Sequence, residues 1–196
     1  MFYQTNGRNN VMPVTKTDKE TIIKKSIHLF KVHGYYNTTM ANIGDACGLI
    51  KGSIYHHFKS KEDLAFECLK YIHEYFNTEI FSIAYRNNMS SSNKLEVFTK
   101  KVETYFLNSE GGCLLGNFAL EISNNIPSLK QEIKSYFDHW EQALCEILKS
   151  KFIKQVAQEK AKQIIANTQG SIMMMRLYDS PHTFKSQNKE IKKLLS

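Results

Sequence analysis

One stretch of the sequence, GLIKGSIYHHFKSKEDL at residues 48–64, gathers side chains that could bind a polyanion, hold a metal ion or act on a substrate. It places five polar side chains within a short span: Lys51, Ser53, Tyr55, His56 and His57. The two histidines are adjacent, so on a helix they would point about 100° apart and could not share one metal ion, which needs HxxxH spacing. Contact with nucleic acid, or an ordinary solvated helix face, are the interpretations that remain.

Two short helices joined by a tight turn would present these side chains on one face. Apolar residues at helical spacing predict a helix that starts at Thr39, and Gly48 supplies the turn that ends it. A second short helix then covers residues 51–57, with Ile54 and Phe58 turned toward the core. In a helix-turn-helix of this kind, the second helix enters the major groove of DNA while the first crosses the phosphate backbone.

Small and hydrogen-bonding residues flank these two helices. Gly52 leaves the start of the second helix slim enough for close approach to a ligand. Thr38 and Thr39 can offer hydroxyl and N–H groups to a phosphate, and Lys61, at the start of the next helix, can reach another. The unit over residues 39–58, with its flanks, is therefore predicted to contact DNA.

The rest of the chain also reads as helices, with neither a credible strand nor an internal repeat. A first helix is expected from Thr17, with Glu20 as its capping-box partner, to Gly34. Ser60 and Asp63 form another capping box, which opens a long helix. The helices expected from there on cover residues 60–84, 94–107, 113–124, 127–151, 155–178 and 183–195.

The predicted fold class is all-α, with an N-terminal three-helix head that contains the helix-turn-helix, followed by a larger helical body. The expected divisions are a flexible arm over residues 1–16, a DNA-binding head over 17–64 and a body over 65–196. No flexible linker separates head and body, so the two are expected to be mechanically coupled.

Composition restricts the classes of protein. The 196 residues carry a formal net charge of +7, which suits a polyanionic partner, and 42% are hydrophobic, which is ordinary for a globular protein. Four widely spaced cysteines form no CxxC pair, so reduced thiols in the cytoplasm are expected. No apolar run reaches the roughly 20 residues of a membrane span, and residues 1–16 lack the apolar segment of a signal peptide. The sequence predicts a cytoplasmic location and neither a cofactor, a metal ion nor a membrane partner.

The segment TTMANIGDACGLIKGSIYHHFKSKEDL, with the preceding LFKVHGYYN, closely resembles the DNA-binding head of the TetR/AcrR family of bacterial repressors. The resemblance covers residues 17–69, and it implies an all-α body that dimerises through its last two helices and often encloses a ligand pocket. The phosphate contacts that it implies are made by Thr38, Thr39, Tyr55, His56 and Lys61. The residues that it places nearest base edges are Lys51, Ser53 and Tyr55. Gly52 and His57 complete the predicted DNA-binding surface.

Two residues depart from the pattern of this family. Ile50 stands where the family has a small or hydroxyl N-cap such as serine, and an isoleucine side chain cannot cap N–H groups. Gly44 replaces a common alanine, which predicts a loss of about 1 kcal/mol in the stability of the supporting helix.

Aromatic residues are dense in the predicted body, where helical core and small-molecule pocket are both open interpretations. In the pocket interpretation, a few polar groups among the aromatic side chains would orient the ligand. The residues predicted to line this effector pocket are Phe76, Tyr105, Cys113, Asn117, Phe118, Glu121, His139, Trp140 and Gln169.

Cys113 follows two glycines, Gly111 and Gly112, that place it at or near a helix N-terminus. The helix dipole could lower the pKa of the thiol there and make it reactive toward oxidants or electrophiles. A Gly-Cys at this point resembles a segment of some redox- or electrophile-responsive family members. The alternative is a small buried residue at a helix start, since free cysteines are commonly buried.

A dimer is expected because one short recognition helix reads few base pairs, whereas two related by a two-fold axis read a palindrome. The segment IIANTQGSIMMMRLYDS offers small and sulfur-containing residues that would let a partner helix approach closely. The predicted interface residues are Ala166, Gly170, Met173, Met174 and Leu177.

These patterns together predict a homodimeric transcriptional repressor that a small-molecule effector releases from a palindromic DNA operator. Effector binding would displace the helix after Ser60 and change the separation of the two recognition helices. An alternative is a repressor that senses oxidants or electrophiles through Cys113. A remote alternative is an enzyme with Cys113 as nucleophile and His139 as base, but no signature surrounds either residue, so the chain is not expected to be an enzyme.

Overall fold

The computed structural model describes residues 18–122 and 125–195, and within these ranges every regular element is a helix, so the all-α prediction is confirmed. The predicted arm over residues 1–16 lies outside the described residues, as do Thr17 and residue 124, which were expected as helix ends. The α-helices are α1 (Lys19–Asn37), α2 (Met40–Cys47), α3 (Lys51–His57), α4 (Lys61–Glu79), α5 (Ser91–Leu107), α6 (Leu114–Ile122), α7 (Pro127–Leu148), α8 (Lys154–Leu177) and α9 (His182–Lys192). Short 3₁₀ helices, Phe81–Tyr85 and Lys193–Leu195, follow α4 and α9.

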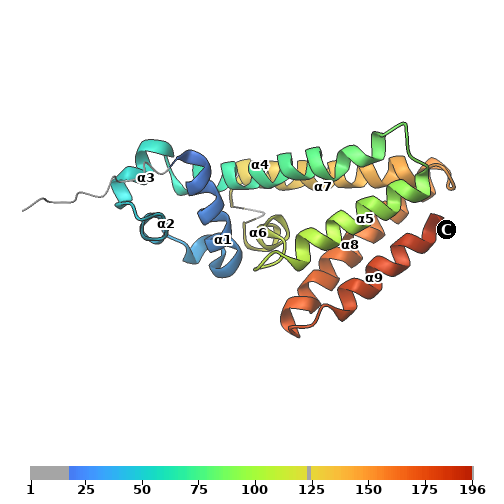
Figure 1. The fold of residues 1–196 in the computed structure, drawn as a ribbon. Helices are drawn as coiled ribbons and strands as arrows, with labels where there is room; N and C mark the ends of the chain where they lie inside the picture. Colours follow the sequence, from blue (N-terminus) through green and yellow to red (C-terminus); the bar gives the residue numbers. More distant parts are fainter. Residues whose placement is uncertain (1–17, 123–124, 196) are drawn as a thin grey trace, which may run out of the picture.

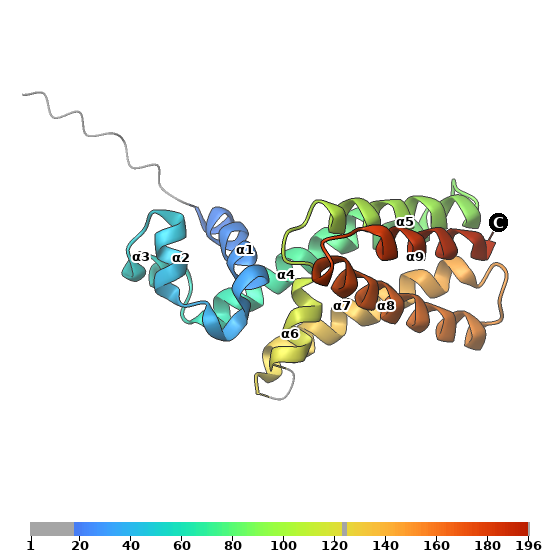
Figure 2. The same cartoon turned by 90° about the horizontal axis from the view of Figure 1, so that it is seen from below.

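A small head of α1, α2 and α3 lies at one end of the molecule, and α5 and α7 to α9 form a larger body (Figures 1 and 2). α4 begins in the head and runs into the body, where it packs along α7. α6 lies at the junction and packs on α1 of the head and on α7 of the body. Head and body are thus joined by helices that belong to both.

α1 is interrupted at Gly34, where the sequence predicts its end. The helix begins after Asp18, whose side chain accepts a hydrogen bond from the N–H of Thr21 at 2.7 Å and so provides the cap that was expected of Thr17. At Gly34 the backbone adopts φ 82° and ψ 172°, which residues with a Cβ rarely do, and the chain then continues to Asn37. The first regular helical segment therefore ends at Gly34 as expected, and what the sequence does not predict is the short segment after the kink, which ends at Asn37.

α2 and α3 form the predicted helix-turn-helix. Thr39 caps α2 reciprocally with Asn42: the N–H of Asn42 donates to Thr39 Oγ1 at 3.2 Å, and the N–H of Thr39 donates to Asn42 Oδ1 at 3.0 Å. Gly48 ends α2 in the left-handed region at φ 67°, as the predicted turn requires. Ile54 and Phe58 are buried, which confirms their expected inward orientation.

Gly44 has a role in packing that the sequence comparison misses. A Cβ built at this position would lie 2.7 Å from the carbonyl oxygen of Leu49, closer than real Cβ contacts. Glycine therefore allows α2 to pack against the turn that follows it. The expected loss of helix stability at Gly44 stays a prediction, and this close packing is a second effect of the same residue.

α4 begins with the expected cap and ends earlier than expected. Ser60 Oγ accepts a hydrogen bond from the N–H of Asp63 at 3.0 Å, and the carboxylate of Asp63 accepts one from the N–H of Lys59 at 2.9 Å. α4 ends at Glu79 instead of near residue 84, because the chain there forms the 3₁₀ helix.

An aromatic cluster forms the core of the body. The ring of Phe76 lies 5.6 Å from that of Phe81, 5.2 Å from that of Tyr136 and 6.0 Å from that of Trp140, measured between centroids. Trp140, the one tryptophan of the sequence, is 1% exposed. For these residues the core interpretation holds. In the described part of the chain, no helix is long and apolar enough to cross a membrane.

Candidate nucleic-acid interface and body cavity

α3 presents a polar and basic face to solvent because its apolar residues point into the core. Ile54 and Phe58 anchor the helix in the core of the head. Ser53 is half-buried, and the exposed residues of the helix are Lys51, Gly52, Tyr55, His56 and His57. The ammonium of Lys51 lies 5.9 Å from the centre of the Tyr55 ring, so a cation and a phenol project from one place. Such a face offers donors both to phosphates and to base edges.

The two threonines before α2 have different environments. Thr39 is exposed at the N-terminus of α2, where the helix dipole favours an anion. Thr38 is 1% exposed, and its hydroxyl donates to the carbonyl oxygen of Gly34 at 2.7 Å. The predicted phosphate contact by the Thr38 side chain does not fit this burial. Thr38 instead ties the start of α2 to the kink of α1.

Lys61 is also positioned by the kink. Its Nζ donates to the carbonyl oxygen of Tyr35 at 2.9 Å and lies 4.3 Å from the centre of the Tyr35 ring. An ammonium group has three donors, so others are left for the predicted phosphate contact.

Ile50 occupies the N-cap position of α3. Its side chain makes no capping hydrogen bond, as expected, and is 78% exposed. A large apolar side chain therefore stands beside the polar residues of α3 at the outer edge of the head.

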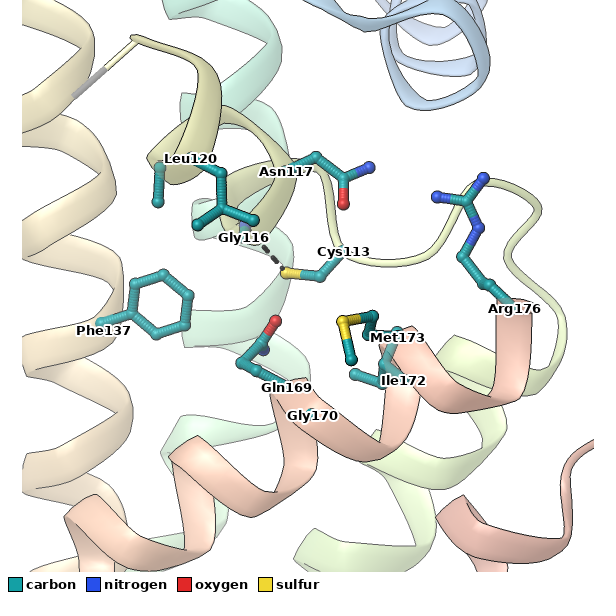
Figure 3. Close-up of a pocket in the computed structure, with 11 residues that line it drawn as sticks. Cys113, Gly116, Asn117, Leu120, Phe137, Gln169, Gly170, Ile172, Met173 and Arg176 are labelled. Carbon is teal, nitrogen blue, oxygen red and sulfur yellow. Dashed lines mark hydrogen bonds between the residues drawn. The ribbon is translucent and has the colours of Figure 1, made fainter. Parts of the chain in front are cut away.

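A cavity of about 400 Å³ lies between α6, α7 and α8. α6 and α8 face each other across it, and Phe137 of α7 closes one side (Figure 3). The cavity is lined by Cys113, Gly116, Asn117, Ala119, Leu120, Phe137, Gln169, Gly170, Ile172, Met173 and Arg176. Most of this lining is apolar, and its volume is within the range of small-molecule sites, roughly 300–1,000 Å³.

Two polar side chains of the cavity are fixed through the loop before α6. The guanidinium of Arg176 donates to the carbonyl oxygen of Gly111 at 2.7 Å, and the amide of Asn117 donates to the same oxygen at 3.0 Å. No Asp or Glu is among the described residues of the lining. The cavity is therefore suited to a neutral or anionic molecule with a large apolar surface.

Three of the nine residues predicted for an effector pocket line this cavity, namely Cys113, Asn117 and Gln169. The others lie elsewhere: Phe76, Phe118 and Trp140 are buried in the core, Tyr105 packs against Phe76 and Phe106, His139 contacts His73, and Glu121 contacts α1. Sequence reasoning missed Gly116, Ala119, Leu120, Phe137, Ile172 and Arg176. The small residues of α6 were the available signal, because small side chains within a helix leave room for a neighbour or a ligand.

The environment of Cys113 reverses the expected effect on its thiol. Cys113 does precede α6, and its sulfur accepts a hydrogen bond from the N–H of Gly116 at 3.4 Å. Burial nevertheless raises the pKa of the Cys113 thiol, although Gly116 and Gln169 act in the opposite direction. Of the two interpretations of this residue, its burial supports the small buried thiol at a helix start over the reactive thiol.

Cys113 and His139 belong to different sites. His139 Nδ1 lies 2.9 Å from His73 Nε2, and His73 Nδ1 lies 2.7 Å from a carboxylate oxygen of Glu132. These three side chains connect α4 to α7. Among the described residues, His139 makes no hydrogen bond to the thiol of Cys113. Within the described ranges, no group of three His, Cys, Asp or Glu residues could hold a metal ion.

The outer face of α8 and α9 carries the predicted dimer residues. Met173 and Leu177 are 59% and 66% exposed. A groove between the two helices is lined in part by Ala166, Gly170 and Met174. This face is open in the single chain.

Two family models match the chain. Residues 22–68 match the model described as "Bacterial regulatory proteins, tetR family", and residues 92–190 match "Transcriptional regulator LmrA/YxaF-like, C-terminal domain". The first match contains the helix-turn-helix, and the second contains α6, α7 and α8 and most of α5 and α9.

Individual proteins agree with these matches. The chain is 34% identical to the uncharacterised HTH-type transcriptional regulator YerO of Bacillus subtilis over 61% of its own length and 40% of that relative's length. It is 26% identical to the HTH-type transcriptional repressor DhaR of Mycobacterium sp. over 81% of its own length and 82% of that relative's. The crystal structure of a TetR transcriptional regulator from Legionella pneumophila superimposes with a TM-score of 0.82 at 26% identity, over 93% of this chain and 98% of that one.

Proposed function

The chain belongs to the TetR family of bacterial transcriptional regulators, and we propose that it is a homodimeric repressor released from a palindromic operator by a small molecule bound between α6, α7 and α8. The observation that carries this proposal is the exposed polar face of α3, anchored by two buried apolar residues within a family-typical head. These polar side chains contribute nothing to the packing of the core, so a binding partner is the natural reason for their presence.

In the proposed complex α3 lies in the major groove. Lys51, Ser53 and Tyr55 would approach base edges, while Thr39, His56 and Lys61 would hold the phosphate backbone. Thr38 is not included, because its side chain is buried at the kink.

The face of α8 and α9 supports the proposal of a dimer. Met173 and Leu177 are large apolar side chains that a second copy would cover. Gly170 has no atom within 4 Å of the position of an added Cβ, so nothing in the described chain requires a glycine there. A closely approaching partner helix would explain it.

The cavity supports the proposal of an effector. It is lined mainly by apolar side chains, with a few fixed polar groups, as ligand sites generally are. Burial of the Cys113 thiol favours reversible occupation of the cavity over covalent sensing at that residue. Neutral or anionic compounds with an aromatic or aliphatic body are the class to screen.

The test is DNA binding by fluorescence anisotropy, on a duplex selected by the full chain from a random-sequence library. We expect Tyr55→Ala to weaken binding by about tenfold or more, whereas Tyr85→Ala, which removes an exposed tyrosine of the body, should not change it. Measurements at two salt concentrations with competitor DNA separate recognition from charge attraction. Weak binding of every duplex, lost at higher salt and equal in both variants, would contradict the proposal.

A further inference from the structure

α6 is a short helix with two faces in use. One face, with Gly116, Asn117 and Leu120, lines the cavity. The other packs on α1, where the ring of Phe118 meets those of Phe30 and Tyr35 edge-on, at 5.5 and 5.6 Å between centroids. If a molecule in the cavity moved α6, the contacts of α6 with α1 of the head would change.

Glu121 makes the polar contact between α6 and the head. Its Oε2 accepts a hydrogen bond from the backbone N–H of Tyr35 at 2.8 Å. The carboxylate occupies the space next to Gly34, since a Cβ at that residue would lie 2.7 Å from Glu121 Oε1. The kink of α1 thus provides both the N–H group and the room for this side chain.

The same kink holds the start of the DNA-binding unit. The carbonyl oxygen of Gly34 accepts the hydroxyl of Thr38 at 2.7 Å, and the carbonyl oxygen of Tyr35 accepts Nζ of Lys61 at 2.9 Å. Thr38 is followed by Thr39, the cap of α2, and Lys61 begins α4. Three elements therefore make hydrogen bonds to Gly34 or Tyr35: α6 through Glu121, the start of α2 through Thr38, and α4 through Lys61.

We propose that Glu121 is the positioning residue through which occupation of the cavity sets the orientation of the DNA-binding head. The inference rests on the proposed function, because it assumes that the cavity holds the effector. It adds a route to the expected one: α7, which contributes Phe137 to the described lining, packs on α4, whereas α6 packs on α1 and so connects the cavity to the head without α4.

The packing of α6 indicates how the movement would arise. A Cβ added to Gly116 would lie 2.6 Å from Oε1 of Gln169 on α8, so the two helices are already close at this point. A molecule that fills the cavity and reaches Gly116 would press on this close contact between α6 and α8. Because α6 lies between α8 and α1, its displacement would change the contact between Glu121 and the N–H of Tyr35.

The chain allows a test that needs no known effector. Gly116→Leu places a side chain in the cavity and acts as a built-in occupant, while Glu121→Ala removes the acceptor at the kink. Operator affinity is measured by anisotropy for the wild type, each variant and the double variant, on the library-selected duplex. We expect Gly116→Leu to weaken binding about tenfold when Glu121 is present and less than about twofold when it is Ala.

A second measurement reports the contact itself. Hydrogen exchange of the Tyr35 amide, followed by NMR of the full chain, should become about tenfold faster or more in Glu121→Ala. Glu121→Gln keeps an acceptor oxygen and should retain most of the protection and the response to Gly116→Leu. Glu159→Ala, at an exposed site of α8, is the control for the loss of a carboxylate.

The outcomes separate this inference from the proposed function. Equal weakening by Gly116→Leu with and without Glu121 would overturn the role of Glu121 and leave control by the cavity intact. Unchanged Tyr35 exchange in Glu121→Ala would also overturn it. Full DNA binding by Gly116→Leu would overturn both the inference and the cavity as the control site. Failure of the wild type to select any duplex would contradict the repressor function itself.

Discussion

The head and the body are built from interactions of different range. In the head, residues a few positions apart define the elements: Thr39 caps α2 with Asn42, and Ser60 caps α4 with Asp63. In the body, the cavity exists because α6, α7 and α8 pack around it, and its lining comes from segments far apart in the chain. Local rules can therefore describe the DNA-binding surface, whereas the effector site depends on tertiary packing.

The two regions also differ in how their cores are built. The core of the head is mainly aliphatic, with Phe58 among its buried side chains, while the body contains a cluster of aromatic rings around Phe76 and Trp140. A small unit buries less of its surface than a large one, so it depends more on each anchor. This difference can be tested by removing one anchor.

The largest effect is expected for Phe58→Ala. Removal of a ring that is 1% exposed should lower the free energy of unfolding of the head by about 3–5 kcal/mol. In urea titrations, the circular dichroism of the helices should then begin to change at lower denaturant. Fluorescence of Trp140 reports on the body alone, because it is the one tryptophan, and its midpoint should move much less.

Coincident transitions in both signals would show that head and body do not differ in this way. They would mean that α4 and α6 couple head and body into one cooperative unit, so that the loss of an anchor in the head is shared by the whole chain. Tyr55→Ala, at an exposed aromatic residue of α3, is the matched control and should leave both midpoints nearly unchanged.

Gly44→Ala should have the next largest effect. It tests whether helix propensity or packing determines the sign of the change in the free energy of unfolding. Helix propensity alone predicts a gain of about 1 kcal/mol. The close approach of Leu49 predicts instead a loss of about 1–3 kcal/mol, since a methyl group at this place forces the turn to move. Thermal unfolding decides the sign, and a stabilised variant would show that the turn adapts without cost.

Much of the head could be predicted because its signals are local. The caps at Thr39 and Ser60, the turn at Gly48 and the buried positions of α3 all follow from residue types at short spacing. The burial of Thr38 could not be predicted in this way, because it depends on a kink at Gly34 that α6 helps to hold.

The cavity was harder to predict for the same reason. The aromatic residues that suggested a pocket fill the core, and the lining instead uses small residues of α6 and the end of α8. The pKa of Cys113 shows the same limit: its place before a helix is local, but its burial against α8 is not, and burial determines the direction of the shift.

Alkaline pH tests how dry the interior of the chain is. Burial raises the pKa of the thiols of Cys68 and Cys113 above their ordinary value of 9.0. Above that value the thiols lose their protons in the unfolded chain but keep them in the folded one. The free energy of unfolding should therefore be constant with respect to these thiols below about pH 9. It should fall at higher pH by up to about 1.4 kcal/mol per pH unit for each thiol. Urea unfolding at several pH values measures this slope. Cys113→Ala should reduce it, and an unchanged slope in that variant would mean that water reaches the thiol.

The smallest effect is expected at Ile50, where stability and recognition should change in opposite directions. Ile50→Ser supplies a capping oxygen that α3 lacks, which should raise the free energy of unfolding by about 0.5–1 kcal/mol. The exposed isoleucine beside the recognition face is suited to the methyl group of a thymine. The serine variant should therefore bind the duplex selected by the wild type a few-fold more weakly, whereas Ile50→Val, which keeps an apolar surface, should not. Repeating the selection with Ile50→Ser should relax the preference at one base pair of each half-site. If the wild type and Ile50→Ser select identical sequences, Ile50 does not read the DNA. The missing cap of α3 would then have no compensating gain in specificity.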